Sequence, residues 1–368
     1  MLDIIKNPKR ILSIHHKLAM GEVILLSVAF RIIKENIPEA TLSVVAGGYA
    51  CDFIKSIPYV DSVMPIERFG IFMGNVSRLK RLFYRPFIVP KLSMFLRRGN
   101  YDCVFIRDDE RLPYTRLIRT VVDKSNIKEV VALKSLMQKH LNSSRHVVEG
   151  YLAILKELGF KVSGDERPVF APTSESIERA ISFLEKHGIS KNKHKIVGLS
   201  PTSAMKIKEM DIEKVSELCR MLAKDQSVKI LLFSTNKEYT NEVLKSVNEP
   251  PVIVGYLPFN DLIALVAQCN QFISVDTGPM HVAAAVGVPT IGIFGPTSGK
   301  MFGPYGKDCI VLQKTPDCPH YRPDSFFSPE EKTFQACYIQ DRCLIMDRSC
   351  VDLISPGEII ETLSTLKG

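Results

Sequence analysis

The sequence contains no tryptophan, and none of its apolar runs is long enough to span a membrane. A helix that crosses a bilayer needs about 20 apolar residues, and the first residues lack the hydrophobic region of a signal peptide. Five of the nine cysteines stand singly in apolar segments, which fits a reducing compartment. From these features we expect a cytoplasmic protein.

Sequence motifs of several common enzyme classes are missing. There is no G-x-G-x-x-G, which gives dinucleotide oxidoreduction little support, and no G-x-S-x-G, which argues against a serine hydrolase. The segment Gly295–Met301 imitates a Walker A loop, but it is one residue short and lacks the final Ser or Thr. No D-x-D occurs, which argues against a nucleotide-sugar site bridged by a metal ion.

Four cysteines gather near the end of the chain, with His320 close by: Cys318, Cys337, Cys343 and Cys350. None of them forms a C-x-x-C pair, so the sequence signals a zinc site only weakly. Buried or free thiols are the favoured interpretation. Whether these thiols bind a metal stays open at this point, and the sequence predicts no resident metal and no cofactor.

The chain has 368 residues, about twice the length of a typical domain, so we expect two domains. Its apolar content of 45% and charged content of 24% are those of an ordinary globular protein. The net charge of +8 favours an anionic partner. A nucleotide sugar, phospholipid headgroups and nucleic acid all satisfy this condition, and charge alone does not choose among them.

Short apolar runs alternate with helix-period segments along the chain, an order typical of α/β proteins. In the first half we expect strands at Arg10–His15, Thr41–Ala46 and Tyr101–Ile106, and a shorter one at Tyr59-Val60-Asp61 followed by Val63-Met64-Pro65. A helix is expected at Val23–Lys34. In the second half we expect strands at Lys195–Leu199, Lys229–Phe233, Pro251–Val254, Phe272–Val275 and Thr290–Phe294. The charged, proline-containing segment 162–172 reads as a linker, which predicts two Rossmann-like domains, 1–170 and 171–368.

The stretch Phe272–Thr297 reads as strand, polar turn, short helix and strand. Such turns lie at the carboxyl end of a parallel strand, where open α/β sheets bind ligands. Thr277 can cap the helix, Gly278 allows close approach of a ligand, and Pro279 suits the first helical position. This arrangement directs free N–H groups and a partial positive charge at an anion, most naturally a pyrophosphate.

The motif in this stretch, Asp276-Thr277-Gly278-Pro279-Met280-His281-Val282-Ala283-Ala284 followed by G-x-P and F-G-P-T, resembles the heptosyltransferase family of lipopolysaccharide core biosynthesis, glycosyltransferase family 9. The resemblance implies the GT-B architecture, two Rossmann-like domains facing across a cleft. It also implies inverting, metal-independent transfer of heptose from ADP-heptose, a co-substrate bound by the second domain. The acceptor, a lipid of the lipopolysaccharide inner core, belongs to the first domain.

The resemblance also suggests two catalytic residues. Glu22 stands where the family carries the carboxylate proposed as general base, but the family has Asp there, so the side chain is one methylene longer. The alternative is an acid that only stabilises a helix N-terminus. Lys208 aligns with a family lysine that neutralises the departing diphosphate, although Met210-Asp211 replaces the usual Trp-Pro. Lys206 competes for this role, and both lysines could simply be solvated.

Seven further positions match the family's donor-binding pattern: Ser203, Glu238, Leu257, Asp276, Thr277, Gly278 and His281. By resemblance, Ser203 approaches phosphate oxygens, Glu238 the ribose hydroxyls and Leu257 the adenine. Asp276 would orient hydroxyls of the donor sugar, and the amides of Thr277 and Gly278 would stabilise the departing ADP. His281 would support the turn or the phosphates. The helix expected at 355–366 would pack back across the first domain.

The segment 69–100, an insertion in the first domain, contains seven basic residues, six aromatic side chains and no acidic residue. Such a segment could lie on the cytoplasmic face of an anionic membrane or grip a phosphorylated lipid acceptor. A solvated helix pair packed on the domain is an equally good interpretation. Single-stranded nucleic acid also favours basic and aromatic residues, but no nucleic-acid motif accompanies them, so we expect no such partner.

Two other functions stay open. The Glu22 and Met210-Asp211 departures would suit a GT-B enzyme with another donor or acceptor, such as a protein or a teichoic-type polymer. A non-catalytic member of the fold that only binds a nucleotide sugar or a lipid would bind donor without turnover.

Overall fold

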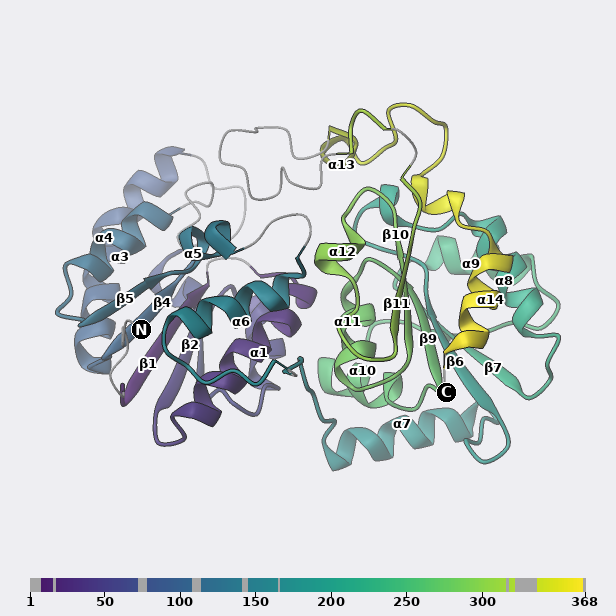
Figure 1. Cartoon of the computed structure of the whole chain (residues 1–368), viewed down its shortest axis with the longest axis horizontal. Helices are drawn as coiled ribbons and strands as arrows, with labels where there is room; N and C mark the ends of the chain where they lie inside the picture. Colours follow the sequence, from purple (N-terminus) through teal and green to yellow (C-terminus); the bar gives the residue numbers. More distant parts are fainter. Residues whose placement is uncertain are drawn as a thin grey trace. The chain divides into compact units, whose positions relative to one another are not determined.

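The computed structural model describes residues 8–15, 18–71, 78–107, 114–140, 145–164, 166–315, 318–321 and 336–366. The chain divides into two compact units. The first comprises Met1–Leu141 and Val148–Glu166, and the second comprises Asn142–Val147 and Arg167–Gly368. Each unit contains a parallel sheet covered by helices, which confirms the predicted α/β class with two Rossmann-like domains (Figure 1).

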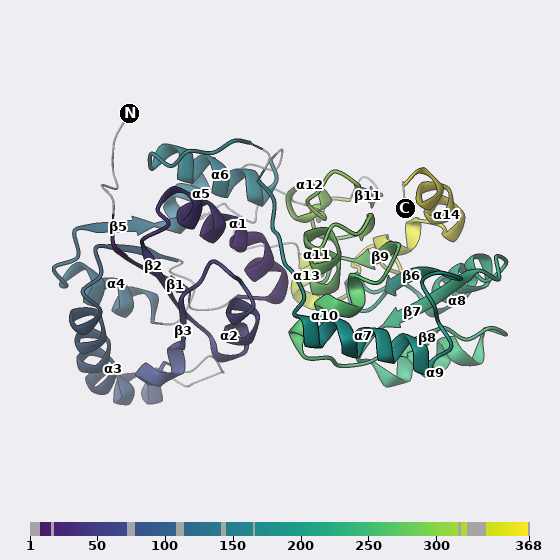
Figure 2. The ribbon, with the colours of Figure 1, turned by 90° about the horizontal axis from the view of Figure 1, so that it is seen from below.

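The first unit has a five-stranded sheet in the order β3-β2-β1-β4-β5. Its strands are β1 (Arg10–His15), β2 (Thr41–Ala46), β3 (Ser62–Pro65), β4 (Cys103–Ile106) and β5 (Glu129–Ala132). Its helices are α1 (Met20–Asn36), α2 (Gly48–Lys55), η1 (Ile66–Phe69), α3 (Arg78–Gly99), α4 (Thr115–Asp123), α5 (Leu133–His140) and α6 (Val147–Glu157). One face of the sheet packs against α3 and α4, and the other packs against α1 and α6 (Figure 2).

The second unit has a six-stranded sheet in the order β11-β10-β9-β6-β7-β8. Its strands are β6 (Lys195–Ser200), β7 (Val228–Phe233), β8 (Val252–Val254), β9 (Gln271–Val275), β10 (Thr290–Phe294) and β11 (Cys309–Gln313). Its helices are α7 (Ser174–Lys186), η2 (Lys206–Lys208), α8 (Ile212–Leu222), α9 (Lys237–Lys245), α10 (Phe259–Val266), α11 (Gly278–Ala285), α12 (Gly299–Phe302), α13 (Ala336–Gln340), η4 (Cys350–Leu353) and α14 (Pro356–Thr365).

The central strands that the sequence predicts are buried on both faces of a sheet, whereas the predicted edge strand β3 is exposed or half-buried. Every residue of β9 and of β10 is buried, as expected for central parallel strands covered by helices. β5 and β11, which lie at one edge of each sheet, were not predicted from the sequence. These edge strands are mostly half-buried, although each contains a short apolar run, Val130–Ala132 in β5 and Cys309–Leu312 in β11.

Two expectations about helices need correction. The basic segment does not form a pair of helices in its described part, because a single helix, α3, runs through Pro86 and Pro90. The last helix, α14, contributes Ile359 and Leu363 to the core of the second unit and contacts α8 and β10. It is therefore an integral part of the second unit.

Packing in the centre of the second sheet depends on a glycine in β6. Gly198 lies directly beside Phe272 of β9, and the Phe272 ring fills the space that a side chain on Gly198 would need. A Cβ atom at Gly198 would come within 2.3 Å of that ring. Phe272 in turn packs against Phe233, with 5.3 Å between ring centroids.

Gly198→Ala is therefore expected to destabilise the second unit by about 1–3 kcal/mol, because overpacking forces Phe272 away from its position. Urea unfolding followed by circular dichroism measures the change. Gly255→Ala is the matched control, since a Cβ there meets nothing within 4 Å. Equal stability of the two variants would contradict this account of the sheet.

Candidate functional site

Three loops of the second unit converge because their strands are neighbours. β10, β9 and β6 are adjacent and parallel, so the loops that follow them leave from the same edge of the sheet. The loop after β6 carries Lys208, the loop after β9 carries Asp276, and the loop after β10 carries Thr297. Ligands of open α/β sheets bind at this edge.

Lys208 and Asp276 form an ion pair in which each side chain is only 14% exposed. The Lys208 ammonium lies 3.1 Å from Asp276 Oδ2 and also donates to the Asp276 carbonyl oxygen at 2.9 Å. Thr297 Oγ1 donates to the same carboxylate oxygen at 2.7 Å. The Tyr338 ring lies 6.0 Å from the ammonium, which adds a weak cation–π contact. A positive charge is thus held in a fixed place at the edge of the sheet.

The backbone of η2 determines which lysine of the Lys206-Ile207-Lys208 sequence reaches Asp276. Ile207 is buried, and its N–H donates to Asp341 Oδ1 at 3.0 Å. Lys206 is exposed, whereas the Lys208 side chain points to the β9 loop and makes the ion pair. The structure therefore separates the two lysines that the sequence left in competition, and it places Lys208 beside the motif.

The helix that follows Asp276 differs from the expectation in two ways. It begins at Gly278, so Pro279 occupies its second position rather than its first. Thr277 occupies the N-cap position in an extended conformation, but its hydroxyl accepts no hydrogen bond from the helix. The expectation that this side chain caps the helix is wrong, because Pro279 has no N–H to offer and Met280 N–H bonds to the Thr277 carbonyl. The Thr277 hydroxyl and the Gly278 N–H remain unused within the helix, at its positive end.

Two buried histidines stand near this helix and are neutral at physiological pH. His281, only 5% exposed, has a pKa lowered to about 4, mainly by burial and further by Lys208. Its Nδ1 has no hydrogen-bond partner among the described residues. His146 also has a pKa lowered to about 4 by burial; its Nε2 lies 3.1 Å from the Gly303 carbonyl, and its ring packs on Tyr305. Neither ring carries a charge that could neutralise phosphate.

The other predicted donor residues lie in neighbouring loops. Ser203 follows β6, and its N–H donates to Glu209 at 3.1 Å. Glu238 is exposed on the first turn of α9 and lines a surface hollow with Glu242 and Lys245. Leu257 is half-buried between β8 and α10. Among the described residues, no hydrogen bond or ion pair joins these three side chains to Lys208 or Asp276.

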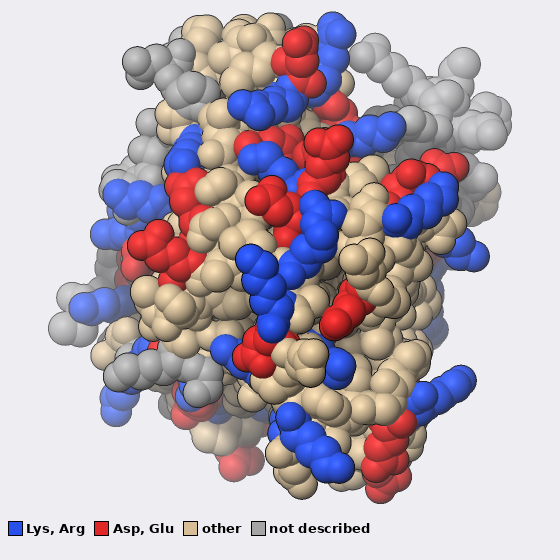
Figure 3. Space-filling model, turned by 90° about the vertical axis from the view of Figure 1, so that its right-hand side faces the viewer, with Lys and Arg blue, Asp and Glu red and all other residues tan. Residues whose placement is uncertain are grey.

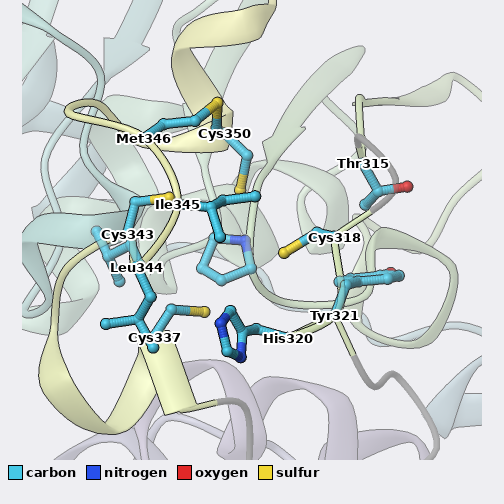
Figure 4. Close-up of a pocket in the computed structure, with 12 residues that line it drawn as sticks. Thr315, Cys318, His320, Tyr321, Cys337, Cys343, Leu344, Ile345, Met346 and Cys350 are labelled. Carbon is cyan, nitrogen blue, oxygen red and sulfur yellow. The ribbon is translucent and has the colours of Figure 1, made fainter.

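The four clustered cysteines line a pocket behind η2, together with Ile207 and His320 (Figure 4). All nine cysteines of the chain are free thiols. Burial, and then the neighbouring thiols, raise the pKa of Cys350 to about 11, so it is a weak nucleophile. Within the described ranges, no group of three or more His, Cys, Asp or Glu side chains is arranged to hold a metal ion.

Glu22 lies in the first unit, on the first turn of α1 after β1. Its Oε2 accepts a hydrogen bond from the Ala19 N–H at 2.7 Å, and its Oε1 lies 3.1 Å from an Arg107 guanidinium nitrogen. The Glu22 side chain is 39% exposed and that of Arg107 is 26% exposed. The carboxylate is therefore fixed by the helix start and by a cation, yet it remains open to solvent.

Several polar side chains surround this ion pair. Tyr49 donates a hydrogen bond to the Leu18 carbonyl, and burial raises its pKa. Burial also raises the pKa of Tyr151 to about 12. His15 is buried at the end of β1, 2.7 Å from the Ser13 hydroxyl, and burial with the nearby Arg107 charge lowers its pKa to about 3. All three groups are neutral at pH 7, so Glu22 and Arg107 supply the charge here.

Sequence reasoning missed two residues of these sites, Thr297 and Arg107. Thr297 ends the F-G-P-T part of the motif, and the neighbouring position of β9 and β10 would have placed it near Asp276. Arg107 directly follows β4, which pairs with β1, so it emerges next to the loop that precedes Glu22. Knowing the strand order would have identified both residues.

Comparison with known proteins agrees with the fold and the motif. The sequence profile of glycosyltransferase family 9 (heptosyltransferase) matches residues 114–324. The chain is 24% identical over 301 residues to lipopolysaccharide heptosyltransferase 3 of Escherichia coli, covering 79% of this chain and 85% of that protein.

Two solved structures share the fold over nearly the whole chain. A glycosyl transferase of family 9 from Veillonella parvula superposes with a TM-score of 0.74 at 19% identity, covering 97% of this chain and 96% of that one. The E. coli ADP-heptose lps heptosyltransferase II superposes with a TM-score of 0.67 at 18% identity, covering 96% and 97%. None of the described helices is both long and apolar enough to cross a membrane.

The profile spans more than half of the sequence and includes the Asp276–Ala284 motif together with the Lys208 loop. This chain therefore belongs to glycosyltransferase family 9, the heptosyltransferase family, and is a glycosyltransferase.

Proposed function

We propose that the protein transfers heptose from ADP-heptose to a hydroxyl of a lipopolysaccharide inner-core acceptor, with inversion at the anomeric carbon and without a metal ion. The Lys208–Asp276 pair beside the N-terminus of α11 carries the proposal. A departing diphosphate needs positive charge, and here a lysine and a helix N-terminus supply it. The names of the relatives, a lipopolysaccharide heptosyltransferase and an ADP-heptose lps heptosyltransferase, support this donor and acceptor.

The donor belongs to the second unit in this proposal. The diphosphate accepts hydrogen bonds from the Gly278 N–H and from Lys208, which turns from the Asp276 carboxylate toward the stronger anion. Asp276, still held by Thr297, then orients hydroxyls of the sugar. Ser203, Glu238 and Leu257 complete the contacts to phosphate, ribose and adenine. His281 supports the turn from below as a neutral ring.

The acceptor belongs to the first unit, where Glu22 is the base. The acceptor hydroxyl attacks the anomeric carbon and gives its proton to the Glu22 carboxylate. The bond from that carbon to the diphosphate oxygen breaks with its electron pair, and ADP leaves. The longer Glu side chain reaches the Ala19 N–H and Arg107 at the same time, which fixes the base on a rigid helix start.

The reaction is placed in the cytoplasm, with the enzyme in peripheral contact with the membrane that holds its lipid acceptor. The nine free thiols support a reducing compartment.

The direct test is mass-spectrometric detection of ADP released from ADP-heptose, with and without a lipid A–Kdo acceptor. Acceptor-dependent release is expected. Binding of ADP-heptose without release of ADP, whatever the acceptor, would show that the protein only binds the nucleotide sugar. Nucleotide release from another sugar nucleotide but not from ADP-heptose would show that the donor is a different sugar nucleotide. The replacement of Trp-Pro by Met210-Asp211 does not by itself favour a different donor or a non-catalytic protein. Both residues have structural roles, since Met210 is buried in the core and Asp211 caps α8.

Lys208→Met is expected to lower kcat by about 10²- to 10³-fold, because the charge on the departing diphosphate loses its cation. Steady-state ADP release measures this effect. Lys206→Met, which changes the exposed lysine of the same short helix, should leave kcat within about twofold of wild type. Equal losses in both variants would contradict the assignment of Lys208.

Glu22→Gln is expected to lower kcat by about 10²- to 10⁴-fold while ADP-heptose binding is unchanged, because the amide does not accept the proton. Calorimetric titration of the donor and acceptor-dependent ADP release separate the two effects. Glu35→Gln is the matched control on the same helix, where Glu35 pairs only with Arg31 in the described part of the chain. Normal turnover by Glu22→Gln would contradict the role of Glu22 as the base and would indicate that it only stabilises the start of α1.

Stability is expected to fall with pH below about 6.5, since folding holds His15, His146 and His281 neutral with pKa values of about 3, 4 and 4. The unfolded chain binds protons that the folded chain does not, so the stability is complete above the unfolded pKa and is lost toward the folded values. Each histidine contributes up to about 1.4 kcal/mol per pH unit in this window.

Urea unfolding at about pH 7 and about pH 5 tests this pH dependence. His281→Gln should reduce the slope of stability against pH, whereas the control His187→Gln changes an exposed ring and should not. A flat profile for the wild type would contradict the buried neutral state of these histidines.

A further inference from the structure

Helix α3 has one face in the core of the first unit. Ile88, Leu92 and Leu96 are buried at 0%, 2% and 2% exposure. Phe95 packs against Phe69 and Tyr101, with ring centroids 5.1 and 5.7 Å apart. These residues recur at the spacing of one helix face, which fixes the rotation of α3 on the sheet.

The opposite face of α3 presents apolar side chains to solvent. Phe87 is 64% exposed and Met94 is 49% exposed. They are seven residues apart, close to two helical turns, so they lie in one line along the helix. Pro90 and Lys91, both exposed, stand on the turn between them. Large exposed apolar side chains in a line are costly unless a partner covers them.

This outer face is positively charged. Lys91, Arg97 and Arg98 are exposed, and none of them forms an ion pair with another described residue. The whole segment 69–100 contains no acidic residue. The face of the second unit in Figure 3 differs, because there Lys and Arg are interspersed with Asp and Glu. The described outer face of α3 therefore combines apolar and basic side chains without acidic ones.

We propose that α3 is a membrane-docking helix that lies on the surface of an anionic bilayer. Phe87, Pro90 and Met94 enter the boundary between headgroups and acyl chains, while Lys91, Arg97 and Arg98 contact lipid phosphates. Single-stranded nucleic acid fits less well, since Phe87 is the one exposed aromatic side chain among the described positions of this helix. The inference rests on the proposed lipid acceptor, and it names the surface that brings the enzyme to it.

The topology determines the direction in which α3 crosses the first unit. The helix follows β3 and leads back to the start of β4, so its first residues lie at the edge of the sheet that also carries Glu22. The helix ends at the opposite edge, where the Gly99 carbonyl accepts a hydrogen bond from Arg10 at the start of β1. The docking face, Phe87 to Arg98, therefore extends from the middle of α3 toward that opposite edge.

Vesicle co-sedimentation of the full chain tests the proposal. Wild type should bind vesicles that contain phosphatidylglycerol and should not bind vesicles of phosphatidylcholine alone. A triple variant, Lys91→Glu, Arg97→Glu and Arg98→Glu, should lose at least about tenfold in binding. The matched control reverses three exposed lysines of the second unit, Lys186, Lys191 and Lys193, and should bind as wild type does.

A second variant, Phe87→Ser with Met94→Ser, separates insertion from charge attraction. It should bind anionic vesicles more weakly, and its remaining binding should fall more steeply with salt than that of wild type. Both α3 variants change exposed side chains, so thermal unfolding should match wild type.

ADP release with a delipidated, water-soluble acceptor should be unchanged in both α3 variants, while release with acceptor in vesicles should fall. If the wild type releases no ADP with any acceptor, the proposed function is contradicted, whereas the docking proposal is judged by vesicle binding alone. Equal vesicle binding by wild type and both variants would overturn the docking helix. Binding of a single-stranded oligonucleotide in place of anionic vesicles would overturn it as well.

Discussion

The central constraint in this structure is the ion pair of Lys208 and Asp276 at the carboxyl edge of the second sheet. Both groups are largely removed from water, and such a pair is stable only when further hydrogen bonds compensate for the lost hydration. Thr297 and the Asp276 carbonyl provide them. The loops after β6, β9 and β10, which are far apart in sequence, are thereby joined through Lys208, Asp276 and Thr297. Lys208 thus lies next to the N-terminus of α11 before a substrate binds. In the proposed reaction, a diphosphate offers this lysine more negative charge than a single carboxylate does.

In the first unit, a charged side chain is likewise fixed by an ion pair and a hydrogen bond. Glu22 is held by the Ala19 N–H and by Arg107, so its charge and position are set by the start of α1 and by the end of β4. The Glu22 side chain makes both contacts, and it is one methylene longer than the Asp of the family pattern. Glu22, which departs from the family pattern, is thus held in place by the Ala19 N–H and by Arg107. Around the pair, burial keeps His15, Tyr49 and Tyr151 uncharged, which leaves one anion and one cation facing the solvent.

Much of the fold could be predicted from the sequence, because central parallel strands are continuous apolar runs. β1, β2 and β10 have the predicted bounds, and the loop after β9 begins the predicted helix. The family resemblance is confirmed by the profile match, whereas the roles of the individual site residues stay predictions. The half-buried edge strands β5 and β11 were not predicted, although each contains a short apolar run. Thr297 and Arg107 depend on which strands are neighbours, and Thr277 shows that a residue suited to capping can occupy the N-cap without bonding to the helix.

A crystal structure of the protein with ADP-heptose tests the central claim most directly. The account predicts a diphosphate oxygen within about 3 Å of Lys208 Nζ and another within about 3 Å of the Gly278 N–H, with Asp276 still bonded to Thr297. A diphosphate bound elsewhere, with the Lys208–Asp276 pair unchanged, would contradict it.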